Sequence, residues 1–62
     1  MSTKEQALYN LLHDEGYSYG AVVTAMQILS QSREAMDDVI AYVYDEHPSE
    51  MELIEHIAQI CS

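Results

Sequence analysis

The segment Gly16–Leu29, GYSYGAVVTAMQIL, constrains the fold of this chain more than any other. Its first five residues have the composition of a turn, and the run from residue 21 to residue 29 is apolar except for Thr24 and Gln27. A short helix that is hydrophobic on nearly every side is normally buried in a soluble protein. We therefore predict a buried helix over about residues 20–30, covered by amphipathic helices from the segments on either side.

The first amphipathic helix is predicted before this turn, over about residues 4–15. Apolar residues recur there at the three- and four-residue spacing of one helix face, at Ala7, Leu8, Leu11 and Leu12. Ser2 and Glu5 have the spacing of a capping box at its start. Gly16 is suited to end the helix, because glycine readily adopts the left-handed conformation found after helix C-termini.

Serine residues are the expected N-caps of the next two helices. Ser18 precedes the apolar run, and Ser32 precedes a helix predicted over residues 33–46. The apolar stripe of that third helix consists of Met36, Val39, Ile40 and Val43. His47-Pro48 is expected to stop it, because the residue before a proline is pushed out of the helical region.

A fourth helix is predicted over residues 50–60. Ser49 and Glu52 form another capping box at its start. The residues expected on its inner face are Leu53, Ile54, Ile57, Ala58 and Cys61. Four short helices with tight connections predict an all-α bundle, folded as a single domain over residues 1–62.

Charge is the strongest bias in the composition. Eleven Asp and Glu residues face only Lys4 and Arg33, which gives a formal net charge of −9. Direct binding of nucleic acid is not expected, because the chain has almost nothing with which to neutralise phosphates. Attraction to an anionic membrane surface is disfavoured for the same reason. A basic protein partner, in contrast, would be attracted by this charge.

Size and cysteine content suggest a cytoplasmic protein. The single cysteine, Cys61, excludes an internal disulfide and fits a reducing compartment. We see no signal peptide, and no apolar run approaches the ~18 residues of a membrane span. A chain of 62 residues lies at the small end of what folds alone. Homodimerisation through the helix at 50–60 is therefore one way to complete its core.

The polar residues do not suggest an enzyme or a cofactor site. The adjacent carboxylates at 37–38 and 45–46 point about 100° apart on a helix, whereas a glycosidase pair must face each other across a cleft. Glu52 and His56 have the spacing of two metal ligands on one helix face, but a structural zinc site needs four. We expect no catalytic residues, no metal and no cofactor.

Four features occur in order along residues 5–44: the turn Gly16-Tyr17, the mid-helix pair Ala25-Met26, the cap Ser32 and the third-helix pair Val39-Ile40. Together they resemble the ubiquitin-associated (UBA-like) three-helix domains. That family usually has a Met before the glycine, within the apolar patch that meets ubiquitin, where this chain has Glu15. The resemblance implies a compact protein-binding core of three helices, extended by a C-terminal helix, without implying a particular ligand.

Tyrosines are the candidate partner-binding residues. The chain has five Tyr and neither Phe nor Trp, and tyrosine is enriched at interface hot spots. We expect an aromatic patch formed by Tyr17, Tyr19, Tyr42 and Tyr44, with the carboxylates of Asp38, Asp45 and Glu46 around it. Alternatively, the same rings only cover a small core, because tyrosine tolerates half-burial with its hydroxyl in water.

These features favour a non-enzymatic protein–protein interaction module with an acidic, tyrosine-bearing surface and a basic or amphipathic partner. Two alternatives remain. The first is an acidic inhibitor that mimics nucleic acid on a DNA- or RNA-binding protein, using the carboxylates of Asp37, Asp38, Asp45, Glu46, Glu50, Glu52 and Glu55. The second is a homodimeric structural protein.

Overall fold

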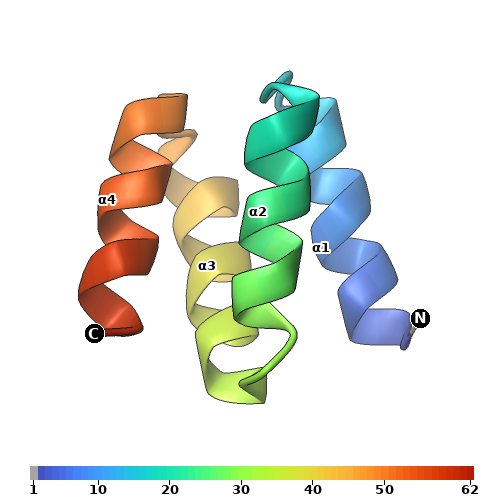
Figure 1. The fold of residues 1–62 in the computed structure, drawn as a ribbon. Helices are drawn as coiled ribbons and strands as arrows, with labels where there is room; N and C mark the ends of the chain where they lie inside the picture. The colour runs from blue at the N-terminus through green and yellow to red at the C-terminus, as the bar shows by residue number, and fades with distance from the viewer. Residues whose placement is uncertain (1) are drawn as a thin grey trace.

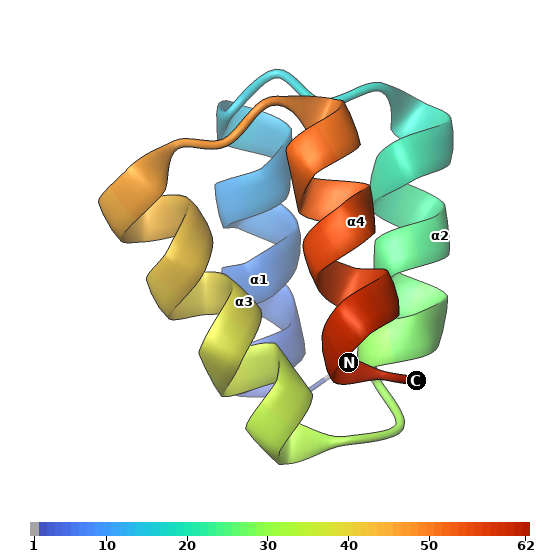
Figure 2. The ribbon, with the colours of Figure 1, turned by 90° about the vertical axis from the view of Figure 1, so that its left-hand side faces the viewer.

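The computed structural model describes residues 2–62. Four helices occur in this range, and no strand: α1 (Thr3–Asp14), α2 (Tyr19–Leu29), α3 (Arg33–Glu46) and α4 (Glu50–Ile60). They run alternately up and down, so that α2 and α4 point in the same direction (Figures 1 and 2). The expected all-α bundle is confirmed, with α1 and α2 each lying one residue earlier than predicted. No helix in the described range has both the length and the apolar content needed to cross a bilayer.

A serine caps the start of every helix. The side-chain oxygen in each case accepts a hydrogen bond from the backbone N–H three residues later, at Ser2, Ser18, Ser32 and Ser49. At α1 and α4 the capping box is complete, because the carboxylates of Glu5 and Glu52 accept the N–H of the capping serine at 2.9 Å. These backbone hydrogen bonds lower the pKa of both carboxyls. Helices α3 and α4 therefore begin at the predicted residues, and α1 and α2 begin one residue earlier.

Left-handed residues end two of the helices. Gly16 follows α1 with a φ of 85°, as predicted. His47 ends α3 with a φ of 47°, whereas the proline after it had suggested an extended conformation. The backbone N–H of His47 still bonds to the Val43 carbonyl at 2.9 Å, and its Nδ1 lies 3.1 Å from a Glu15 carboxylate oxygen. The ends of α1 and α3 are thus joined at the same end of the bundle.

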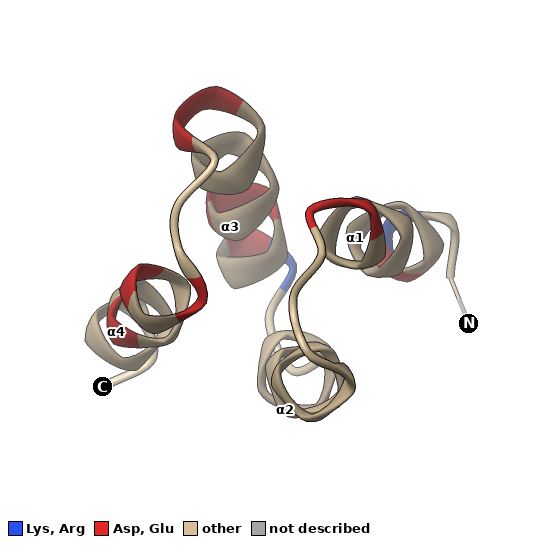
Figure 3. Ribbon diagram, turned by 90° about the horizontal axis from the view of Figure 1, so that it is seen from above, with Lys and Arg blue, Asp and Glu red and all other residues tan. Residues whose placement is uncertain are grey.

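The core is built by all four helices. Its buried members are Leu8, Leu12, Val22, Ala25, Leu29, Ala35, Met36, Val39, Val43, Leu53 and Ile57. Helix α2 contacts each of the other three, and α3 does the same. Within the described residues α1 and α4 do not touch, because they occupy opposite corners of the bundle (Figure 3). Ile40, expected in the stripe of α3, packs against this core while partly exposed.

Two predictions of burial are wrong. Helix α2 is buried on one side only: Ile28 is exposed beside the polar Thr24 and Gln27, and Val23 and Met26 are only partly buried. On α4, which was expected to bury five side chains, only Leu53 and Ile57 are buried; Ile54, Ala58 and Cys61 are exposed. The reason is that α4 packs only on α2 and α3, which cover a narrower arc than its apolar positions span. The exposed apolar residues of α2 and α4 consequently face a shared opening.

Candidate functional site: an apolar groove between α2 and α4

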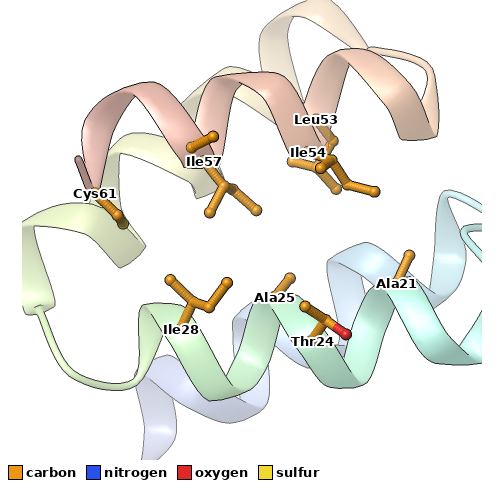
Figure 4. A pocket seen from close by; sticks show the side chains of 9 residues that line it. Ala21, Thr24, Ala25, Ile28, Leu53, Ile54, Ile57 and Cys61 are labelled. Carbon is orange, nitrogen blue, oxygen red and sulfur yellow. The ribbon is translucent and has the colours of Figure 1, made fainter.

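An open cavity of about 320 Å³ lies between α2 and α4. We call it the α2–α4 groove; it is lined by Ala21, Thr24, Ala25, Ile28, Leu53, Ile54, Ile57, Ala58 and Cys61. The side chains of the two helices point toward each other across it (Figure 4). Ligand-binding clefts in proteins begin at about this volume, so the groove is large enough to receive a few apolar side chains.

The shape of the groove follows from the sizes of its side chains. Ala21 and Ala25 on α2 are too small to fill the space between the two helices, and this leaves the groove open. Leu53 and Ile57 form the floor and are almost completely buried. Ile28 and Ile54 form the rims and are 39% and 50% exposed. Large apolar side chains held in water at the edge of an apolar groove are typical of an interaction site.

Charge is distributed unevenly around the groove. No charged residue occurs between Glu15 and Arg33, so the α2 wall is neutral, whereas acidic residues lie on α1, α3 and α4 (Figure 3). Beside the first turns of α4 the groove adjoins a more open hollow, which shares Ile54 and is lined also by Glu50 and Glu55. One end of the apolar groove therefore opens onto carboxylates.

Glu50 is held in place at this end. Its Oε1 accepts the backbone N–H of Ser18 at 2.8 Å, and Ser18 is the cap of α2. The carboxylate thereby bridges the N-termini of α2 and α4, which lie at the same end of the bundle (Figure 1). The acidic end of the groove is therefore a fixed feature, because a backbone donor orients the carboxylate.

Two of the four candidate tyrosines make contacts inside the molecule. The hydroxyl of Tyr17 donates to the Pro48 carbonyl oxygen at 2.6 Å. Burial raises the pKa of Tyr17, with a smaller contribution from the Glu15 carboxylate. Tyr42 stacks on the imidazole of His56, with ring centroids 4.0 Å apart. Both half-buried rings thus hold elements of the bundle together.

The other two candidate tyrosines face solvent. Tyr19 and Tyr44 are 79% and 70% exposed. Tyr19 shares a small hollow with Tyr17, Tyr9, His13 and Val22, while Tyr44 lies near the C-terminal end of α3. The fold therefore brings Tyr17 and Tyr19 to one hollow, and places Tyr42 at the contact between α3 and α4.

The three candidate carboxylates also lie in different settings. Asp38 Oδ1 is 2.6 Å from Nε2 of His56, so this residue belongs to the contact between α3 and α4. Asp45 and Glu46 are exposed in the last turn of α3. Within residues 2–62, no three His, Cys, Asp or Glu side chains converge closely enough to hold a metal ion.

The groove itself was not predicted from the sequence. Its rim residues Ile28 and Ile54 were assigned to the buried core because their spacing is that of an inner helix face. One signal was available, namely the absence of charge from the whole stretch between Glu15 and Arg33 in a chain with a net charge of −9. In so acidic a chain, a long neutral stretch indicates either burial or a binding surface, and α2 provides both.

Comparisons of the chain with protein-family models, with curated proteins and with solved structures find no match. A proposal about function therefore has to rest on the geometry and charge of the chain itself. The α2–α4 groove, with Glu50 and Glu55 in the hollow beside it, is the feature that combines a defined shape with a defined chemistry.

Proposed function

We propose that this chain is a non-enzymatic protein-interaction module that binds a basic or amphipathic protein through the α2–α4 groove. The observation that carries the proposal is the pair of exposed rim residues, Ile28 and Ile54, beside a groove with an apolar floor. Removing such side chains from water contributes roughly 25 cal/mol for each Å² of apolar surface buried. A partner that inserts apolar side chains between these rims gains that free energy.

Charge supports a basic partner. The net charge of −9 attracts cationic proteins and raises the rate of encounter at low salt. The neutral α2 wall has no charged group to desolvate when it is covered, which avoids the main cost of burying polar surface. The acidic residues of the other helices would thus provide long-range attraction, and the neutral α2 wall would provide apolar contact.

Tyr19 and Tyr44 supply additional contacts in this proposal. Both rings are exposed. Tyr19 begins α2 and Tyr44 lies in the last turn of α3, at the end of the bundle where α1 connects to α2 and α3 connects to α4 (Figure 1). Asp45 and Glu46 are exposed beside Tyr44. An amphipathic ring next to a carboxylate suits a lysine or arginine side chain, which has an apolar stem and a cationic head.

The test is a comparison of partner capture by three immobilised proteins, using extract of the cells that produce the chain. Wild type is compared with Ile54→Glu, which places a charge on the groove rim, and with Asn10→Glu, which places the same charge on the exposed surface of α1. We expect wild type and Asn10→Glu to retain a protein that Ile54→Glu loses. Equal retention by all three would exclude the groove as the binding surface.

Salt and DNA distinguish this proposal from nucleic-acid mimicry. A partner held mainly by carboxylates in place of phosphates should be released steeply as salt rises, and free DNA should compete for it. A partner held by apolar contacts in the groove should remain bound, because salt screens exposed charges far more than it weakens apolar contact. Release by salt together with competition by DNA would favour the mimic.

A further inference from the structure

The walls of the α2–α4 groove have the dimensions of a helix-binding site. Each wall is a helix of 11 residues, which corresponds to a length of about 16 Å and three turns. The two helices run in the same direction (Figure 4). A partner helix of about three turns would therefore contact both walls along their full length.

The side chains of the groove suit a helix better than an extended peptide. Small residues on the walls, Ala21, Ala25 and Ala58, allow another helix to approach closely, while Ile28 and Ile54 form ridges on either side. Packing of ridges into such grooves places helix axes about 8–10 Å apart. An extended peptide gains affinity by pairing with a sheet edge, and residues 2–62 contain no strand that could offer one.

The acidic end of the groove determines where the partner must carry its charge. Glu50, fixed by the Ser18 N–H, is the first residue of α4. Glu55, in the middle of α4, lines the same adjoining hollow as Glu50. At the opposite end the lining residues are Ile28 and Cys61. A cation of the partner is therefore favoured at the end near Glu50. At the end lined by Ile28 and Cys61, no lining residue offers a carboxylate to it.

Resting on the proposed function, we propose that the groove binds one amphipathic helix of the partner, with a lysine or arginine in its last turn beside Glu50 and Glu55. Cations are favoured in the last turn of a helix by its own dipole. This places the partner helix antiparallel to α2 and α4, and its negative end then meets their positive ends.

A second copy of this chain does not fit the same requirement. Its only cationic side chains besides histidine are Lys4 and Arg33, which lie in the first turns of α1 and α3. Lys4 is in addition paired with Asp37 at 2.6 Å. The occupant is therefore a different protein, and dimerisation becomes an outcome that would contradict the inference.

The test uses two labelled peptides of about three helical turns. Both have the same amphipathic composition with leucines on one face; in one peptide two lysines occupy the last turn, and in its isomer they occupy the first. We expect wild-type protein to bind the first peptide about tenfold more tightly in fluorescence anisotropy, since a well-placed charge pair is worth about that factor. Ile54→Glu should weaken the binding of both peptides.

Charge variants test whether Glu50 and Glu55 cause the preference for one orientation of the bound helix. The double variant Glu50→Gln/Glu55→Gln should bind both isomers equally, and glutamine keeps an oxygen to accept the Ser18 N–H. The matched control is Asp14→Asn/Glu34→Gln, which removes the same charge from exposed positions outside the groove lining. The control should keep the preference for lysines in the last turn. Loss of the preference in the control as well would assign it to net charge and overturn the inference.

Cys61 provides a second readout, because its exposed thiol lines the groove at the end opposite the carboxylates. Bound peptide should slow alkylation of this thiol by iodoacetamide, and a scrambled peptide should not. Failure of both isomers to bind, or dimerisation of the protein through the groove in sedimentation, would overturn the inference. The capture experiment separates the two proposals. If Ile54→Glu loses its partner there although neither peptide binds, the groove remains the proposed binding surface and only the helical ligand is excluded. If Ile54→Glu keeps its partner, the proposed function is excluded as well.

Discussion

The imidazole of His56 in α4 lies against the phenol ring of Tyr42 in α3, with ring centroids 4.0 Å apart and planes 14° from parallel. On the same imidazole, Nε2 lies 2.6 Å from Oδ1 of Asp38, one turn earlier on α3. Leu53 and Ile57 are the only buried residues of helix α4. The stacked and hydrogen-bonded imidazole therefore contributes a substantial share of the contact between α4 and the rest of the bundle.

Replacing His56 by alanine should lower the free energy of unfolding by about 1–2 kcal/mol, because both the stacking and the hydrogen bond to Asp38 are lost. His13→Ala is the control: this side chain is 71% exposed, and its ring lies 6.1 Å from that of Tyr9. The control should change stability by no more than about 0.5 kcal/mol. Urea denaturation measures both, and equal losses would show that the His56 contact is not specific.

Tyr17→Phe should reveal the hydrogen bond between the Tyr17 hydroxyl and the Pro48 carbonyl. Loss of this bond, 2.6 Å long, should cost about 1 kcal/mol at neutral pH. Tyr19→Phe removes a hydroxyl from a ring that is 79% exposed and should cost almost nothing. The comparison uses urea denaturation, and similar losses in the two variants would contradict the prediction.

Stability should also fall at alkaline pH because of Tyr17. Burial raises its pKa in the folded state above the usual 10.0. A group with a raised folded pKa contributes stability that is complete below about pH 10 and is lost as the pH rises through the folded value. Wild type should therefore lose stability faster than Tyr17→Phe above that pH. Parallel pH profiles for the two proteins would exclude Tyr17 as the source.

The capping boxes should lose strength in acid. Hydrogen bonds from the Ser2 and Ser49 backbones lower the pKa of Glu5 and Glu52 below 4.5. This contribution is present above pH 4.5 and is lost as the pH falls through the lower folded values. The stability advantage of wild type over Glu5→Gln/Glu52→Gln should therefore shrink with acidification in chemical denaturation.

A control for acid effects in general is Glu55→Gln, in the middle of α4. It relieves repulsion in a chain with a net charge of −9, so at neutral pH this variant should be at least as stable as wild type. If the difference in stability between wild type and Glu55→Gln changes with acidification as it does for the double variant, the effect does not come from capping.

The groove geometry predicts very different losses of stability for alanine substitutions at two isoleucines of α4. Ile57→Ala should cost about 2–5 kcal/mol, because Ile57 is only 4% exposed. Ile54→Ala should cost less than about 1 kcal/mol, because half of that side chain is in water. Thermal or urea unfolding distinguishes them, and comparable losses would place Ile54 in the core and remove it from the groove rim.

Local sequence signals predicted the helices well because capping is a local interaction. Ser2 with Glu5, and Ser49 with Glu52, lie three residues apart, so their hydrogen bonds require only the first turn of a helix. The stop at His47 was predicted for the same reason. Its left-handed conformation was not, because the contact between His47 and Glu15 depends on the ends of α1 and α3 meeting.

Burial could be predicted only in part. Periodicity shows which side of a helix is apolar, but the number of neighbours that cover this side is a property of the assembled bundle. Ile54 and Leu53 are adjacent and equally hydrophobic, yet one is half exposed and the other buried. The partners of Tyr17 and Tyr42 likewise come from distant parts of the chain. The likeness to UBA-like domains stays a prediction.

Helix α4 packs less extensively on the other helices than α1 does, and it forms one whole wall of the groove. A small tilt of α4 would change the width of the groove while the packing of α1 against α2 and α3 stays intact. Binding a partner helix with larger or smaller side chains would then require a movement of α4 only. The width of the opening between the two helices thus depends on the orientation of α4 alone.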